Sequence, residues 1–314
     1  MIIIGFLLLI IGADLLVRGA SDVAKKFHIP EMLIGLTIVA LGTSFPELMI
    51  TITSAQKNAT DLIIGNAVGS NLCNLLLIMG LVAIIQPVKI DKETKFVHIP
   101  VALISTLVVL GMGMGILGSS SNVISKIDGI ILVTLFLIYF LYPIIIEIKD
   151  ILGSVKENKK NHIKTEKLVL SIFFIILGVI LLKAGGDLVV NNSTEIALKY
   201  GISESVIGLT IIAIGTALPE LITSIIAVFE KDENLAIGNL IGSCILNSFL
   251  ILGTGALITP LAFSAELIYD LILLTFSIIL IWAFCFVGKK NTITRYNATL
   301  LLVIFSIYFI NLFK

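Results

Sequence analysis

The chain repeats its own sequence at a fixed distance. A shift of 173 residues, the separation of Glu47 and Glu220, aligns positions 12–87 with 185–260 without a gap. The matched stretches are GLTIVALGTSFPEL (35–48) with GLTIIAIGTALPEL (208–221), and IGNAVGSNLCN (64–74) with IGNLIGSCILN (237–247). Apolar residues match by chance in a hydrophobic chain, whereas Gly, Thr, Pro, Glu, Ser and Asn in one order do not. The sequence therefore predicts two copies of one structural unit.

The composition requires lipid as the solvent for most of this chain. Hydrophobic residues make up 58% of the sequence and charged residues 13%, whereas soluble domains average about 45–50% and about 25%. Runs long enough to cross a bilayer as helices cover positions 1–24, 33–55, 62–85, 97–117, 127–148, 168–190, 206–229, 235–258, 267–287 and 297–313. These runs are continuous and do not alternate, which disfavours a β-barrel.

The predicted fold is an all-α membrane protein of ten transmembrane helices. The first repeat occupies residues 1–148, a cytoplasmic linker 149–167 and the second repeat 168–314. Five helices per repeat is an odd number, so the second repeat enters the membrane from the opposite face. Such inverted repeats are typical of secondary transporters, which bind their substrates near the bilayer midplane between the repeats.

The distribution of lysine and arginine predicts the orientation of the chain. With the N-terminus outside, nearly all basic loop residues fall on the cytoplasmic side, including those of the 149–167 linker. The positive-inside rule therefore places both termini outside. The absence of a large regulatory loop indicates a prokaryotic type and the plasma membrane. The net charge is zero, with 21 basic and 21 acidic residues, and does not favour a nucleic-acid partner.

The motif GTSFPE at 42–47 predicts a broken helix. Pro46 lies in mid-span, where it removes an amide donor and clashes with the preceding turn. We expect Pro46 to begin a second half-helix, leaving the carbonyls near Ala40 and Thr43 without helical partners. GTALPE at 215–220 repeats the device, so the predicted second and seventh helices are both broken.

Glu47 and Glu220 lie deep in these two spans. A lone carboxylate in hydrocarbon is expensive and must be neutralised by a cation, a base or a proton. No Lys or Arg lies at comparable depth in the second, third, seventh or eighth predicted helix. A cation or a proton remains, and two protonated structural glutamates are the alternative to a binding site.

The third and eighth predicted helices add neutral oxygens. Ser70 and Asn74 lie four residues apart on one helical face, as do Ser243 and Asn247. Such residues also serve as packing contacts between membrane helices. Beside two glutamates they favour ligation of a hard ion, namely Ca²⁺, Mg²⁺, Mn²⁺ or Na⁺. Two carboxylates balance one Ca²⁺ or two Na⁺, and competition between these ions is sufficient for antiport.

The duplicated motifs resemble the paired alpha-repeats of the sodium/calcium exchanger family, within the cation/Ca²⁺ exchanger superfamily. The resemblance covers nearly the whole chain and implies a Na⁺/Ca²⁺ antiporter. It also implies the ligand set, with Ca²⁺ held centrally by the two glutamates and two threonine carbonyls, flanked by two asparagines and two Na⁺ sites. The implied ligands are Glu47, Glu220, Thr43, Thr216, Ala40, Ala213, Ser44, Ser70, Ser243, Asn74 and Asn247.

Two positions depart from the family pattern, and one further property follows from the resemblance. Ala217 replaces the serine expected opposite Ser44, and Asn247 stands where the family often has aspartate. The family's first and sixth helices slide across the core. Here a small-residue face for sliding is expected from Gly12, Gly19, Gly178, Gly185 and Gly186.

Other functions are less well supported by the sequence. A Ca²⁺/H⁺ antiporter, or one for another divalent cation, could use the same scaffold and stays open. An intramembrane protease would use two acids, but no Gly-x-Gly-Asp motif is present. No sequence feature indicates a channel filter or a nucleotide-binding loop. We therefore expect no enzymatic activity and no cofactor; the sequence predicts lipid, Ca²⁺ and Na⁺ as partners and indicates no protein partner.

Overall fold

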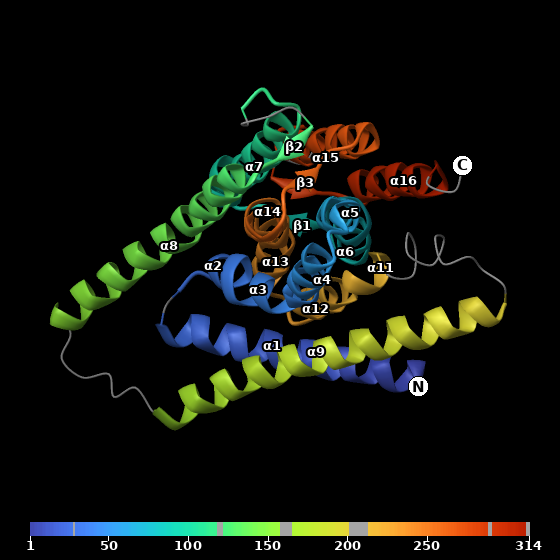
Figure 1. Cartoon of the computed structure of the whole chain (residues 1–314). Helices are drawn as coiled ribbons and strands as arrows, with labels where there is room; N and C mark the ends of the chain where they lie inside the picture. The colour runs from blue at the N-terminus through green and yellow to red at the C-terminus, as the bar shows by residue number, and fades with distance from the viewer. Residues whose placement is uncertain (28, 118–121, 158–164, 201–212, 288–290, 312–314) are drawn as a thin grey trace.

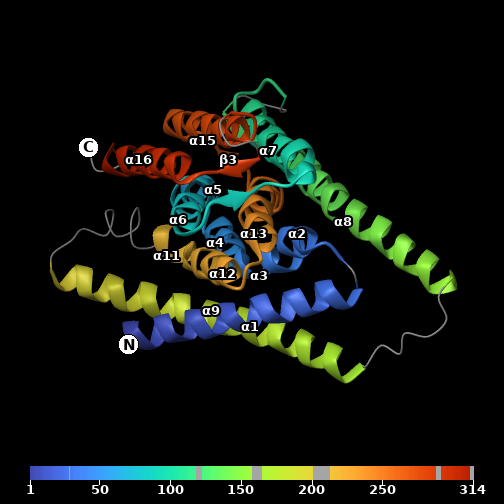
Figure 2. The ribbon, with the colours of Figure 1, turned by 180° about the vertical axis from the view of Figure 1, so that it is seen from behind.

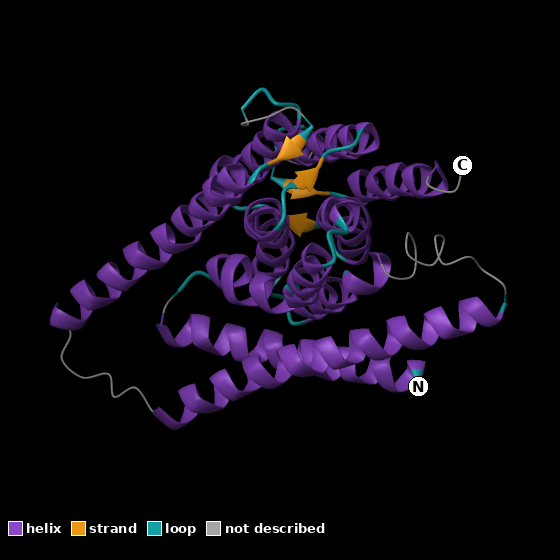
Figure 3. Cartoon of the chain, viewed as in Figure 1, coloured by secondary structure: helices purple, strands orange, loops and turns teal. Residues whose placement is uncertain are grey.

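The computed structural model describes residues 1–27, 29–117, 122–157, 165–200, 213–287 and 291–311. These residues are mostly helical, with short strands between some helices (Figures 1 and 3). The first half contains α1 (Ile2–Phe27), α2 (Glu31–Ile34), the π-helical segment η1 (Gly35–Val39), α3 (Ala40–Thr43), α4 (Phe45–Gln56), α5 (Thr60–Leu72), the π-helical segment η2 (Cys73–Ile78), α6 (Met79–Ile85), β1 (Val88–Lys89), the π-helical segment η3 (Thr94–His98), α7 (Ile99–Gly113), β2 (Val123–Ile124) and α8 (Lys126–Glu157).

The second half follows a similar order of elements. It contains α9 (Thr165–Lys199), α11 (Ala213–Thr216), α12 (Leu218–Phe229), α13 (Glu233–Leu246), the π-helical segment η5 (Asn247–Ile251), α14 (Leu252–Ile258), β3 (Leu261–Ala262), α15 (Ala265–Phe284), β4 (Thr292–Ile293) and α16 (Arg295–Asn311). Helices α8 and α9 extend into the expected 149–167 linker from both sides, since α8 ends at Glu157 and α9 begins at Thr165.

The described helices fit a protein that crosses the membrane several times. Seven of them are long and apolar enough to span a bilayer, and the bent pair Glu31–Thr43 and Phe45–Gln56 gives an eighth candidate. Two more apolar helices, Leu218–Phe229 and Arg295–Asn311, are shorter. The chain is therefore an all-helical, multi-pass membrane protein.

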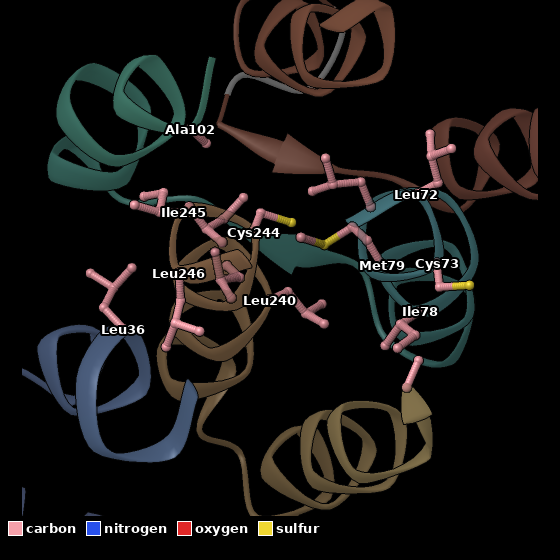
Figure 4. Close-up of a cluster of buried hydrophobic side chains, with 14 of the residues drawn as sticks. Leu36, Leu72, Cys73, Ile78, Met79, Ala102, Leu240, Cys244, Ile245 and Leu246 are labelled. Atoms are coloured by element: carbon pink, nitrogen blue, oxygen red, sulfur yellow. The ribbon is translucent and has the colours of Figure 1, made fainter. Parts of the chain in front are cut away.

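The centre of the molecule is formed by two long helices that occupy equivalent positions in the repeats. Residues 60–85 form α5, η2 and α6, and residues 233–258 form α13, η5 and α14. They are the most buried of the seven span candidates, with 72% and 94% of their apolar windows inside the protein. Figure 4 shows side chains of both helices in the buried cluster, including Leu72, Ile78, Met79, Leu240, Cys244 and Leu246.

The bend in the first repeat lies beside Glu47. Helix α3 ends at Thr43, and α4 begins at Phe45 with Pro46 in its first turn. The two helical arms meet at 47°. In the second repeat α12 also has a proline, Pro219, in its first turn, but residues 201–212 of the preceding arm lie outside the described part of the chain.

Helices α1 and α9 lie side by side on one side of the core (Figures 1 and 2). Glycines allow their backbones to approach closely. A Cβ atom added at Gly12 would lie 2.8 Å from the Leu182 amide nitrogen, and one added at Gly178 would lie 2.7 Å from the Gly12 carbonyl oxygen. Gly5 and Gly185 make the equivalent contact further along. A side chain larger than hydrogen would push the helices apart.

This packing corrects the expectation for the glycine face. Gly12, Gly19, Gly178 and Gly185 pack α1 against α9 and not the pair against the core. Gly186 takes no part, because a Cβ atom added there would meet no atom within 4 Å. The glycines therefore join α1 and α9 to each other.

Two short antiparallel strand pairs connect the repeats, and the sequence did not predict them. Strand β1 pairs with β4 through Val88 and Ile293. Strand β2 pairs with β3 through Ile124 and Leu261. Each pair joins a loop of one repeat to a loop of the other, so the outer helices are tied to the core at their ends.

We expect Gly12→Ala to destabilise the protein although alanine favours helix formation. The new methyl group meets backbone atoms of α9, which cannot move aside as a flexible side chain could. Overpacking of this kind costs about 1–3 kcal/mol. The measurement is the thermal unfolding midpoint of the detergent-purified protein.

Gly186→Ala is the matched control, since it makes the same change in a paired helix where the added atom meets open space. Its midpoint should equal or exceed that of the unchanged protein. Equal losses in both variants would show that close α1–α9 packing is not the cause.

Candidate ion-binding site

The predicted site residues lie on the glutamate-bearing segments and the central helices of both halves of the chain. All those whose exposure is described are buried, with at most 7% of their surface accessible. Ala40 and Thr43 lie on α3, Ser44 between α3 and α4, Glu47 on α4, Ser70 on α5, Asn74 on η2, Ala213 and Thr216 on α11, Glu220 on α12, Ser243 on α13 and Asn247 on η5.

Hydrogen bonds join the two motifs across the repeats. The Ser44 hydroxyl donates to Glu220 Oε1 at 2.9 Å. Its oxygen lies 3.1 Å from Ser243 Oγ. The first repeat thus supplies a hydroxyl to the carboxylate of the second, although the residues are far apart in sequence. This contact brings the two glutamate-bearing segments together.

Glu47 has fewer contacts than Glu220. The Ser70 hydroxyl donates to Glu47 Oε1 at 3.4 Å. Ala217 occupies the position equivalent to Ser44 and has no hydroxyl to give Glu47. The repeats are therefore similar in backbone but unequal in the polar contacts around each carboxylate.

A second polar bridge lies next to the glutamates. The Thr43 hydroxyl donates to Asn239 Oδ1 at 3.0 Å, and Asn239 Nδ2 lies 3.1 Å from Ser224 Oγ. In the first repeat the equivalent residue, Asn66, donates to the Glu47 carbonyl oxygen at 3.4 Å. Both asparagines therefore support the glutamate-bearing segments and use their polar groups within the protein.

Four oxygens of the predicted ligands have no hydrogen-bond partner among the residues that the structure describes. They are Glu47 Oε2, Glu220 Oε2, Asn74 Oδ1 and Asn247 Oδ1, hereafter the four unpaired oxygens, and all are buried. Buried polar atoms are nearly always hydrogen-bonded. Each repeat therefore contributes one carboxylate oxygen and one amide oxygen that are buried and still able to accept a hydrogen bond or bind a cation.

No basic side chain neutralises this site among the described residues. The ion pairs that the structure describes join Arg18 to Asp14 and Glu230, Lys183 to Asp187, Lys199 to Glu195 and His98 to Glu93. None of these pairs includes Glu47 or Glu220. An arrangement of unpaired oxygens around two carboxylates is suited to a hard cation.

The expected free carbonyl at Ala40 is not found. The amide of Ser44 donates to the Ala40 carbonyl oxygen at 3.0 Å. The physical reason is the position of the bend, which lies after Thr43, so the last helical hydrogen bond of α3 survives. A carbonyl oxygen has two lone pairs, and only one of those on Ala40 is used by this bond.

Three buried polar residues near the site were not among the predicted ligands. Thr51 and Thr223 follow the two glutamates by one helical turn and carry buried hydroxyls without a partner. Their spacing of four and three residues from Glu47 and Glu220 places them on the same helical face as the glutamates, and this spacing could have identified them. Asn71 contacts Asn247 from the opposite repeat. The sequence repeat carries no signal at Asn71, because the equivalent residue is Cys244.

Comparison with known proteins gives consistent results. The family model described as sodium/calcium exchanger protein matches residues 1–145 and 170–314. The putative antiporter CaxA of Alkalimonas amylolytica is 33% identical over 97% of this chain and 95% of its own. The sodium/calcium exchanger MaX1 of Methanosarcina acetivorans is 28% identical over 99% and 97%.

A solved structure also covers nearly the full length. The sodium-calcium exchanger NCX_Mj, in crystals soaked without Na⁺ and Ca²⁺, superposes with a TM-score of 0.82 at 32% identity. The superposition covers 99% of this chain and 97% of the other. Given the buried carboxylate pair, the whole-length family match and this likeness of fold, the chain belongs to the sodium/calcium exchanger family.

Proposed function

We propose that this chain is a secondary active antiporter that exchanges Ca²⁺ for Na⁺ across the membrane. The observation that carries the proposal is the set of four unpaired oxygens, buried between the repeats without a basic partner. Buried charges are retained in proteins when they are paired or hold a metal ion. A transported cation would be the partner of the two buried carboxylates. When the cation leaves, the carboxylates are again buried without a counter-charge, which is unfavourable.

The charge and chemistry of the site suit both ions. Glu47 and Glu220 carry two formal negative charges, which balance one Ca²⁺ or two Na⁺. Ca²⁺ binds about six to eight oxygens in flexible geometry, and carboxylates can supply two each. The amide oxygens of Asn74 and Asn247 add neutral ligands. The two negative charges cannot balance Ca²⁺ and two Na⁺ at the same time. Binding of one kind of ion therefore favours release of the other.

We assign the remaining predicted residues to the same site. Thr43 and Thr216 are proposed to give carbonyl oxygens to Ca²⁺. One Na⁺ site is proposed to be formed by Glu47 together with Ala40, Thr43, Ser44 and Ser70. Ala213, Thr216 and Ser243 form its counterpart with Glu220. The contacts of Ser44 with Glu220 and Ser243 support a shared network in which the Na⁺ sites and the Ca²⁺ site overlap.

Coupling to Na⁺ is favoured over coupling to protons. The site chemistry alone fits both, since a proton also neutralises a carboxylate. The relative MaX1 and the structural neighbour NCX_Mj are both named as sodium and calcium exchangers, and this similarity supports the same pair of ions here.

The proposed architecture is ten membrane-spanning helices in two inverted repeats. The seven long helices, the bent pair and the two shorter apolar helices together supply ten candidate spans. We assign residues 1–148 and 168–314 to the two repeats and 149–167 to the connection. Pro46 and Pro219, each in the first turn of a half-helix, are proposed to cause matching breaks beside the two glutamates.

Alternating access is proposed to occur by movement of α1 and α9 together. The glycine contacts hold these helices to each other, and α1 also packs on α12 while α9 packs on α3. The pair therefore lies against both glutamate-bearing bends. Sliding it along the core would uncover the site to one side of the membrane and cover it from the other.

The proposed location is the plasma membrane with both termini outside. The bias of basic residues supports this orientation. A tag inserted within 156–164 should be accessible only from the cytoplasm, and tags at the termini only from outside. The measurement is labelling of intact and permeabilised cells. Termini on opposite sides would contradict the ten-helix arrangement.

We expect Glu47→Gln and Glu220→Gln each to abolish nearly all Ca²⁺ transport. Either change leaves a single negative charge for a divalent ion in a site that water does not reach. The measurement is radioactive Ca²⁺ uptake into proteoliposomes, driven by a Na⁺ gradient with pH clamped on both sides.

Glu195→Gln is the matched control, because the same carboxylate-to-amide change falls on an exposed ion pair with Lys199. Exposed pairs contribute little, so transport should be retained. Near-normal uptake by both site variants would refute the site. Uptake that follows a proton gradient and ignores Na⁺ would favour the Ca²⁺/H⁺ antiporter.

We expect Ala217→Ser to lower the Na⁺ concentration needed for half-maximal exchange. The new hydroxyl would stand toward Glu47 as Ser44 stands toward Glu220. One added oxygen contact contributes about 1 kcal/mol, which corresponds to a several-fold change in affinity. Ca²⁺ depends chiefly on the carboxylates, so the Ca²⁺ dependence should change less.

The opposite change, Ser44→Ala, is the matched comparison and should raise the Na⁺ requirement. Both variants are measured for Na⁺ and Ca²⁺ dependence in the same proteoliposome assay. If Ala217→Ser leaves the Na⁺ dependence unchanged, or shifts Ca²⁺ equally, position 217 is not part of a Na⁺ site.

A further inference from the structure

Asn71 is a buried polar residue at which the two repeats differ. It lies at the end of α5, directly after Ser70, and only 2% of its surface is exposed. The equivalent residue in the second repeat is Cys244. An asparagine so deeply buried must use its polar atoms within the protein, because water cannot reach them.

All the described contacts of the Asn71 side chain are made with the opposite repeat. Its Nδ2 lies 3.2 Å from the Cys244 carbonyl oxygen and 3.2 Å from Ser248 Oγ. Its Oδ1 lies 3.0 Å from Asn247 Nδ2. Asn71 therefore connects the backbone of α13 to the side chain of a proposed cation ligand on η5.

These contacts determine which way both amides point. A backbone carbonyl only accepts hydrogen bonds, so the Asn71 group beside Cys244 must be the nitrogen. The Asn71 oxygen then faces Asn247, and Asn247 must present its nitrogen to that oxygen. The Asn247 oxygen is consequently directed away from Asn71, and it is one of the four unpaired oxygens.

We infer that Asn71 is a positioning residue that holds the Asn247 amide with its oxygen, and not its nitrogen, toward the transported cation. This inference rests on the proposed function. Without Asn71 the Asn247 amide could rotate and present two N–H donors to the ion, which repel it. Asn71 touches no ion itself and acts through Asn247.

The corresponding amide of the first repeat is held differently. Cys244 stands at the position equivalent to Asn71, and the hydrogen bond described for its thiol is donated to the Asn71 carbonyl oxygen at 4.0 Å. Sulfur is a much weaker hydrogen-bond partner than an amide oxygen. The Asn247 oxygen is therefore the more firmly oriented of the two neutral ligands, although the repeats place them symmetrically.

A purely structural role for Asn71 would predict a different result, and a double-mutant cycle separates the two. Asn71→Leu keeps the branching and the number of side-chain heavy atoms, although leucine is bulkier, and it removes every polar contact of the side chain. Asn247→Asp replaces the amide by a carboxylate whose two oxygens are equivalent, so no orientation remains to be lost. The readout is Ca²⁺ affinity, measured by equilibrium dialysis of radioactive Ca²⁺ with the full-length purified protein, which does not require transport.

We expect Asn71→Leu to weaken Ca²⁺ binding about fivefold in the otherwise unchanged chain, the effect of one hydrogen bond. In the Asn247→Asp chain the same change should not weaken binding. Unchanged affinity in the first chain would overturn the inference. Equal weakening in both chains would also overturn it, because Asn71 would then act only by packing α5 on α13.

A second variant guards against a failure to fold. If Asn71→Leu does not elute as a single species in detergent, Asn71→Cys takes its place, since this fold already carries cysteine at the equivalent position 244. The same pattern is expected. Glu220→Gln is measured beside it: loss of Ca²⁺ binding there with no effect at Asn71 refutes only the positioning role, whereas unchanged binding in Glu220→Gln refutes the proposed function.

Discussion

Burying the Glu47 and Glu220 carboxylates away from water has a cost that the protein by itself does not offset. Hydroxyl groups satisfy one oxygen of each, Ser44 at Glu220 and Ser70 at Glu47, while the second oxygen of each has no partner. The described ion pairs lie elsewhere. A desolvated pair of like charges is stabilised when a cation binds. The surrounding helices serve to keep this pair dry and close together.

The duplicated sequence explains how one chain can build such a pair, and the departures from symmetry explain how the halves differ. The glutamate-bearing segments and central helices of the two halves bring polar residues of both halves into contact. Serine against alanine at positions 44 and 217, and asparagine against cysteine at 71 and 244, make the environments of the two carboxylates and two amides unequal. Ca²⁺ and Na⁺ differ in charge and in the number of oxygens they bind. They can therefore prefer different oxygens within one shared site.

The sequence predicted the features that depend on the repeat and on burial in lipid. It indicated the helical, multi-pass membrane fold and the buried positions of Glu47 and Glu220. It could not predict contacts that depend on the exact placement of the bend or on a neighbour from the other repeat. The Ala40 carbonyl keeps its bond because the bend follows Thr43, and a Cβ atom added at Gly186 would meet no atom within 4 Å. The sequence repeat gives no signal at Asn71, whose equivalent is Cys244 and whose partner Asn247 lies in the other half of the chain.

The most direct test of the cation site is to locate a heavier analogue of Ca²⁺ in crystals of this protein. Sr²⁺ has the same charge and scatters X-rays anomalously, so its position can be read without assuming a ligand set. We predict one anomalous peak bounded by the four unpaired oxygens of Glu47, Glu220, Asn74 and Asn247, and loss of that peak when crystals are soaked in high Na⁺. A peak elsewhere, or one that Na⁺ does not displace, would contradict a shared site between the repeats.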